Sequence, residues 1–222
     1  MHFMQRVFSA CALLLVAAGT ARAQVPWETP QLLAPHAPKG VSLLATSYAA
    51  APDDGWGVVV AVRTGHAPSG VGFRIVGGRG RGGENAIGGG IEAARWITRA
   101  SAAFPVDIIA MTGIGGSYGH SAQIALPIGI SAARSLGDDE FWCSPYVAAR
   151  AVIEGRLGGS APADELDLQI ATELGANISF DRNRNFVMRL AAALGDRSAL
   201  ALGVHLGAGP RRAAVQASAA RN

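Results

Sequence analysis

The most constraining feature of this sequence is a long run of alternating apolar and polar side chains at residues 166–180. Starting at Leu166, every second residue is Leu, Leu, Ile, Thr, Leu, Ala, Ile or Phe, and those between are acidic, amide-bearing or small. Successive side chains of a β-strand point to opposite faces, so the run predicts a strand with one apolar and one polar face.

A helix is the alternative interpretation of the surrounding segment, residues 164–181. Leu166, Ile170 and Leu174 are spaced four apart, as on one helical face, and Gly175 could end such a helix. Against this, Leu168 would lie on the helix face opposite Leu166. The alternation therefore favours the strand.

The composition indicates what solvent the apolar face meets. Half of the residues are hydrophobic, only 16% are charged, and the mean hydropathy is +0.25, whereas a soluble domain has about 25% charged residues. Beyond the first segment, no run of about 18 apolar residues could form a membrane-spanning helix. A transmembrane β-barrel fits both observations, because its lipid face needs apolar residues only at alternate positions.

The N-terminus carries the pattern of an export signal. A basic start, MHFMQR, precedes the apolar run VFSACALLLVAAG, and Ala21-Arg22-Ala23 has the form of a cleavage site. The apolar run is too short for a spanning anchor. We therefore expect residues 1–23 to be a cleaved signal peptide of a bacterial protein, followed by an N-terminal extension at 24–39.

Segments of about ten or more residues, separated by turn clusters rich in Gly, Asp, Asn and Pro, fill the chain from 40 to 207. They predict an all-β fold, a closed antiparallel up-and-down transmembrane barrel of about ten strands, with eight or twelve as alternatives. The tail, 208–222, is predicted to be disordered. The expected strands are 40–50, 55–65, 70–78, 86–100, 106–119, 121–135, 140–155, 164–181, 185–195 and 197–207.

The positions of the apolar side chains predict details of the strand pairing, because residues paired across antiparallel strands share a face. The last three strands carry their apolar side chains at even positions. The loops between them must therefore hold an odd number of residues, as 181–185 does. This places Asn177 opposite Arg189. Bulges are expected at Pro127 and Pro145, where the ladder loses a donor. Arg95 falls on the apolar side, which indicates either a bulge near Ala94 or an error in the predicted register.

The polar side of the strands has the character of a narrow lumen. It consists mostly of small residues, with a few charges of both signs, and a soluble exterior would carry more Lys and Glu. We expect the lumen charges to include Arg150, Glu154, Glu173 and Arg189.

Aromatic residues near strand ends suit girdles at the membrane interfaces: Trp56, Phe141, Trp142, Phe180 and Phe186. A soluble periplasmic, lipocalin-like barrel remains the alternative.

In its export signal, its strand repeat and its closing hairpin GDRSALALGVHLG, the chain from about 40 to 207 resembles small outer-membrane β-barrel proteins of the broad OmpA/OmpX/OmpW-like class. The resemblance implies the bacterial outer membrane as location, and the lipid bilayer and the outer-membrane assembly machinery as partners. The chain departs from that class in ending its last strand at Leu206-Gly207, before a polar tail, without a terminal aromatic residue.

Motifs for catalysis or cofactors are weak. His120 lies beside Ser121 and Ser117, and paired acids occur at 53–54 and 138–139, but these are also ordinary turn residues. The other histidines lack metal-ligand spacing, no nucleic-acid motif is present, and the glycine-rich stretch 77–90 lacks a phosphate-loop pattern. We therefore expect no cofactor and no metal, with a barrel hydrolase as a second alternative.

The function predicted from sequence is that of a non-enzymatic outer-membrane barrel with a narrow or plugged lumen. The lumen charges could bridge one another and close the barrel, or they could line a pore for a small polar solute. Envelope structure, adhesion or small-solute passage would follow from these two arrangements.

Overall fold

The structure, a computed structural model, describes residues 34–48, 55–64, 70–80, 85–119, 122–138, 140–157, 166–195 and 198–207. Within these ranges the regular structure consists of β-strands, ten of them long and one, β7, of two residues. No helix among the described residues is long and apolar enough to cross a membrane. The strands are β1 (Gly40–Tyr48), β2 (Gly55–Arg63), β3 (Gly70–Gly80), β4 (Asn85–Thr98), β5 (Asp107–Tyr118), β6 (Ala122–Ala133), β7 (Leu136–Gly137), β8 (Trp142–Leu157), β9 (Leu166–Ser179), β10 (Phe186–Gly195) and β11 (Ala199–Gly207).

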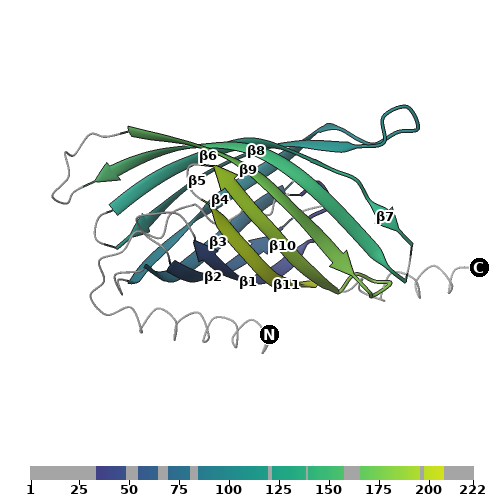
Figure 1. The fold of residues 1–222 in the computed structure, drawn as a ribbon, viewed down its shortest axis with the longest axis horizontal. Helices are drawn as coiled ribbons and strands as arrows, with labels where there is room; N and C mark the ends of the chain where they lie inside the picture. The colour runs from purple at the N-terminus through teal and green to yellow at the C-terminus, as the bar shows by residue number, and fades with distance from the viewer. Residues whose placement is uncertain are drawn as a thin grey trace, which may run out of the picture.

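The strands form one closed antiparallel barrel (Figure 1). Each long strand pairs with the long strands before and after it in the chain. β1 also pairs with β11, which closes the barrel, and β6 pairs directly with β8, although the short β7 lies between them in sequence. The predicted all-β, up-and-down barrel is therefore confirmed. Residues 166–179 of the segment predicted at 164–181 form β9, so the helical alternative is excluded there.

The two ends of the barrel are named from β1. The terminal end is where β1 begins and β11 ends, and the far end is where β1 ends and β11 begins. An antiparallel order brings the first residues of β3, β5, β8 and β10 to the terminal end as well. Residues from both halves of the chain therefore meet there.

Side chains of the barrel wall alternate between the outer and the inner face, and large apolar side chains dominate the outer one. In β10, Met188, Leu190 and Leu194 are exposed on the outer face, whereas Val187 and Arg189 are buried inside. The same division runs through β9 and β11, as the period of two requires. The outer face is thus largely apolar, and buried charges lie inside together with small and apolar side chains, which is unlike a soluble domain.

The hairpin between β9 and β10 has the predicted register. Asn177 of β9 lies opposite Arg189 of β10, which confirms the parity prediction. The turn is closed by Asp181, whose carboxylate accepts hydrogen bonds from the backbone N–H groups of Asn183 (3.0 Å) and Asn185 (2.9 Å). These backbone donors hold the pKa of Asp181 below its usual value.

The bulges expected at the two prolines are absent, so that prediction is wrong. On one side of β6, Pro127 pairs with Val152 of β8 in an unbroken ladder. On the other side, the pairing of β6 with β5 is interrupted near Pro127 and resumes in the same register. Pro145 pairs with Ala176 of β9 and lies just beyond the last residue pair of β6 and β8. Since β6 has ended there, no ladder requires the missing N–H of Pro145.

Arg95 also needs no bulge before it. The β4–β5 ladder runs in register through Arg95 to Trp96, and the irregularity follows between Trp96 and Thr98. Arg95 therefore lies exposed on the outer face, on the same side as Ile91. The bulge predicted near Ala94 is wrong, because the chain tolerates a long charged side chain on that face near the strand's end.

Candidate functional site

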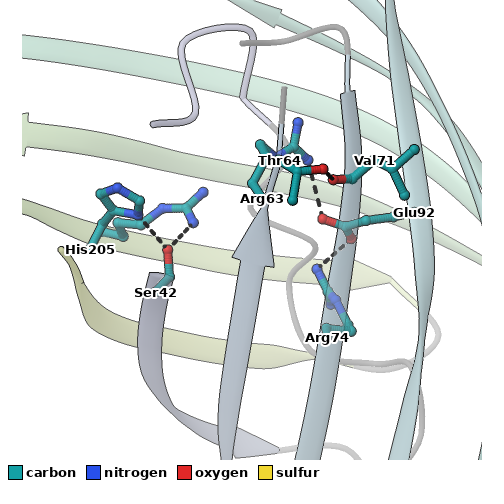
Figure 2. A network of polar contacts seen from close by, with 8 residues as sticks. Ser42, Arg63, Thr64, Val71, Arg74, Glu92 and His205 are labelled. Carbon is teal, nitrogen blue, oxygen red and sulfur yellow. Dashed lines mark hydrogen bonds and ion pairs between the residues drawn. The ribbon is translucent and has the colours of Figure 1, made fainter. Parts of the chain in front are cut away.

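The most distinctive polar site lies inside the barrel near the terminal end, where three strands bring Arg63, Arg74 and Glu92 together (Figure 2). Arg63 Nη2 donates to Glu92 Oε1 at 3.1 Å, and Arg74 Nη2 donates to Glu92 Oε2 at 3.0 Å. All three side chains are at most 9% exposed. One carboxylate thus bridges two buried guanidinium groups, an arrangement whose pairing offsets the cost of removing the charges from water.

A glycine makes this bridge possible. Gly72 of β3 pairs with Arg63 of β2 on one side and with Glu92 of β4 on the other. A Cβ at Gly72 would lie 2.8 Å from both Cγ and Oε1 of Glu92. The absence of a side chain on β3 therefore gives Glu92 the space to reach across to β2.

A second network connects the last three strands to β1. Arg189 Nε donates to Asn177 Oδ1 at 3.0 Å, and Arg189 Nη1 donates to Ser42 Oγ at 2.9 Å. His205 Nε2 lies 3.0 Å from the carbonyl oxygen of Lys39, and Nδ1 lies 3.0 Å from Ser42 Oγ. Because a carbonyl can only accept, Nε2 carries the proton and Nδ1 accepts from the Ser42 hydroxyl.

In the middle of the barrel and toward its far end, the wall of β8 and β9 supplies further polar contacts. The Tyr146 hydroxyl donates to Glu173 Oε1 at 2.6 Å, and Gln169 Nε2 donates to Glu154 Oε2 at 2.9 Å. Tyr146 lies directly opposite Gly175, where an added Cβ would be 2.5 Å from the tyrosine ring. The aromatic ring therefore occupies space that the glycine leaves open.

These groups form one continuous electrostatic system within the lumen. Arg189 interacts with Arg63, Arg74 and Glu92, while Arg150 interacts with Glu173, Arg74 and Glu154. Every one of these side chains is nearly or fully buried. In so dry a site the charges act strongly on one another, so the position of each depends on the rest.

The segment before β1 lies inside the barrel at the terminal end. We call residues 34–39 the N-terminal plug. Ala34, Pro35 and Ala37 are essentially fully buried, and Pro38 lies against the arginine cluster. The backbone N–H of Ala37 donates to the carbonyl of Ala34 at 2.9 Å, which makes a compact turn. The plug thus fills part of the lumen with chain that belongs to no strand.

His36 fastens the plug to two strands. Its Nε2 lies 3.0 Å from Asp107 Oδ2, at the start of β5, and its Nδ1 lies 2.9 Å from Ser144 Oγ of β8. The edge of the ring also faces Trp142, with centroids 6.4 Å apart. Burial lowers the pKa of His36 below its ordinary value, an effect that the Asp107 carboxylate opposes.

A serine, a histidine and an aspartate in contact raise the question of hydrolysis. In the serine-protease arrangement the serine faces Nε2 and the aspartate faces Nδ1, whereas here Ser144 faces Nδ1 and Asp107 faces Nε2. Ser144 is also fully buried. The contact joins the plug to β5 and β8.

The four residues predicted as lumen charges lie on the inner face: Arg150, Glu154, Glu173 and Arg189. Four of the five predicted girdle residues are exposed on the outer face near strand ends, namely Trp56, Phe141, Phe180 and Phe186. Trp142 is the exception and needs correction. It is 4% exposed and lies inside, because Trp142 occupies an inner position of β8 and its Nε1 donates to Ser135 Oγ at 2.7 Å.

Neither the cluster around Glu92 nor the plug was predicted from the sequence. The alternation of faces could have indicated that both residues point into the lumen. Arg63 falls on the polar side of its strand with Gly57, and Glu92 falls on the side of β4 opposite the apolar Ile91. The candidate nucleophile Ser121, the histidine His120 and the paired acids at 53–54 lie outside the described residues, as does Asp139. Within the described ranges, no group of three His, Cys, Asp or Glu side chains could hold a metal ion.

No family model and no curated protein matches this chain. Among solved structures, it is similar to a KdgM porin at 10% identity and a TM-score of 0.33, over 74% of this chain and 97% of that chain. It is also similar to a KdgM porin in complex with disordered oligogalacturonate, at 10% identity, a TM-score of 0.36 and the same coverage. Neither likeness assigns a function to this protein.

Proposed function

We propose that this chain is an integral outer-membrane β-barrel with a closed lumen, and that its role is structural support of the bacterial envelope. The observation that carries the proposal is the reversed polarity of the wall. Large apolar side chains such as Leu168, Ile170 and Leu202 are about 60% exposed, while Arg74, Glu92 and Glu173 are at most 5% exposed. An apolar outer surface of this extent is stable in lipid and would aggregate in water.

The same polarity disfavours a soluble lipocalin-like barrel, which carries its apolar side inside. Aromatic residues support a membrane orientation as well. Phe141 and Phe180 contact each other at the terminal end, with ring centroids 5.4 Å apart, and Trp56 lies exposed at the far end. Such residues suit the two interfaces of a bilayer. The lipid bilayer and the assembly machinery of the outer membrane would be the partners.

The proposal that the lumen is closed rests on the side chains and the plug that fill it. The bridged arginines, Tyr146 with Glu173, and the N-terminal plug occupy the interior, and the cavity beside the plug is only about 10 Å³, about enough for one water. A barrel of this size leaves limited room once side chains fill it. Passage of a small polar solute is the second candidate, which the charged lumen favours and which would require displacement of the plug.

Two measurements test the proposal. The exported protein should sediment with the outer membrane and should migrate faster on a gel before heating than after, as folded barrels do. Recovery from the periplasm without detergent would contradict a membrane location. In planar bilayers we expect no steady current from the intact chain, and a steady open-pore current would contradict a closed lumen while leaving the membrane location intact.

A variant lacking residues 34–39 separates the structural role from the passage role. If the plug alone closes the lumen, deletion produces a steady conductance that the intact chain lacks. If the wall side chains close it as well, as the contents of the lumen indicate, the deletion variant stays silent. A conducting deletion variant would therefore favour small-solute passage over structural support.

A further inference from the structure

The apolar outer face of the barrel does not extend equally far toward the terminal end on every strand. On β9 and β10 it continues to Phe180, just past the end of β9, and to Phe186, at the start of β10, and both rings are exposed. On β4 it is interrupted by Arg95, three residues before the strand ends at Thr98. One side of the barrel thus presents aromatic rings near this end, whereas the β4 side presents a cation.

The strand register places a second arginine on the same face. Arg95 pairs with Ala110 of β5, and Ala110 pairs with Ile130 of β6, so these three residues form one row across the wall. Arg134 follows four residues after Ile130, and its backbone N–H donates to the carbonyl of Pro145 at 3.3 Å. This contact continues the register of β6 and β8. Arg134 therefore shares the outer face with Ile130.

We call the outer-face residues Arg95, Ala110, Ile130, Ala132 and Arg134 the arginine panel. Both arginines are exposed. Their backbone positions are two strands and four residues apart, or about 16 Å from the usual strand spacing and rise. The alanines between them carry only methyl groups, so the wall stays low where the two long side chains extend.

No ion pair joins either arginine of the panel to a carboxylate of the described residues. Asp107 at the start of β5 is turned inward, where it pairs with His36. Asp138, in the turn after β7, accepts two backbone N–H groups of its own turn. The counter-charge that the panel meets in a membrane therefore comes from outside the described part of the chain.

We infer that the arginine panel binds the headgroups of anionic phospholipids at the terminal end of the barrel. The inference rests on the proposed membrane location. A charged side chain on the lipid face is unfavourable in hydrocarbon, and a negatively charged headgroup near the guanidinium stabilises it. The guanidinium group also presents paired N–H donors that match the oxygen atoms of a phosphate.

The apolar side chains beside the arginines favour a lipid over a soluble acidic partner. Ile130 is 53% exposed, and Ile97, two residues beyond Arg95 on β4, is 57% exposed. A phospholipid covers such side chains with its acyl chains while its phosphate meets the arginines. A zwitterionic headgroup carries an ammonium group that two arginines repel, so the panel should prefer a headgroup with net negative charge.

The test is native mass spectrometry of the full exported chain in mixed micelles of phosphatidylglycerol and phosphatidylcholine with identical acyl chains. We expect the intact chain to retain phosphatidylglycerol in preference. Arg95→Gln and Arg134→Gln should each lower that preference by about fivefold, the effect of one arginine near an anionic surface. Because both side chains are exposed, neither substitution removes a buried contact. Equal retention of the two lipids by the intact chain would overturn the inference.

A control variant locates the effect. Lys39 is an exposed cation just before β1 at the same end of the barrel, away from the panel. Lys39→Gln removes the same amount of charge and should leave the lipid preference unchanged. A preference that survives the combined Arg95→Gln and Arg134→Gln substitutions, or one that Lys39→Gln removes, contradicts the assigned position.

A vesicle experiment separates this inference from the proposed function. The intact chain is folded into vesicles of phosphatidylcholine alone and of phosphatidylcholine with phosphatidylglycerol, and heat-modifiable gel mobility reports insertion. Insertion into both, followed by equal retention of the two lipids, would overturn the role of the arginine panel alone. Failure to insert into either would overturn the proposed membrane location, and the lipid site with it.

Discussion

The two ends of the lumen are built from the same strands but are filled differently. At the terminal end, charged side chains and the N-terminal plug meet, with Glu92 bridging two arginines and His36 bridging two strands. Toward the far end, the wall of β8 and β9 still carries the buried pair Glu154 and Gln169. The inner positions of β10 and β11, however, hold small apolar residues there: Ala191, Ala193, Ala199 and Ala201. Alternation therefore decides which residues face inward, but side-chain size and charge decide how the lumen is closed.

This difference has an energetic consequence. A cluster of buried charges is stable only as a complete set, because removing one member leaves the others uncompensated. Small apolar residues lose little when one is changed for another of similar size. We therefore expect the terminal end to be the more sensitive to substitution.

The largest expected effect comes from Glu92→Gln. The substitution leaves Arg63 and Arg74 buried without their shared carboxylate, which should lower the free energy of unfolding by about 3–5 kcal/mol. The measurement is urea unfolding in detergent micelles or vesicles. Glu154→Gln is the matched variant toward the far end, where Gln169 Nε2 donates to Glu154 Oε2, and its effect should be smaller. Equal losses would remove the proposed contrast between the two ends.

Gly175→Ala should have the next largest effect. The new Cβ would lie 2.5 Å from the ring of Tyr146, and overpacking of this kind lowers the free energy of unfolding by about 1–3 kcal/mol. Gly155→Ala is the control, since its Cβ would meet only Leu166 at 3.7 Å. Adding Tyr146→Ala should recover part of the loss, and a Gly175→Ala variant as stable as the control would show that the ring and glycine do not share space.

The smallest expected effect is the pH dependence that His36 gives to the plug. Burial lowers the pKa of His36 in the folded state below 6.5, its ordinary value, so the unfolded chain binds more protons in that window. The stability due to His36 is present above pH 6.5 and is lost as the pH falls through the lower, folded-state pKa. In the His36→Asn variant, urea midpoints should fall less between pH 7 and pH 5 than in the unchanged chain. A steeper fall in the variant would contradict the direction of the shift.

Much of the barrel could be predicted because its wall obeys a local rule. The period of two indicated the strands, and the odd loop at 181–185 indicated that Asn177 lies opposite Arg189. Trp142 was assigned wrongly because its place near a strand end suggested an interface residue, although it shares the inner face of β8 with Ser144 and Tyr146. The prolines were misjudged because a missing N–H matters only where a neighbouring strand requires it, and none does at Pro145.

The sequence by itself determined the strands, their order and the face that each side chain takes, because these depend on alternation and loop length along the chain. Only the tertiary structure decided which inward side chains from distant parts of the sequence meet. His36 and Ser144 are 108 residues apart in sequence, and Ser42 and His205 are 163 apart. Their contacts arise from barrel closure between β1 and β11 and from the return of the N-terminal plug into the lumen. Neither event leaves a periodic pattern in the sequence.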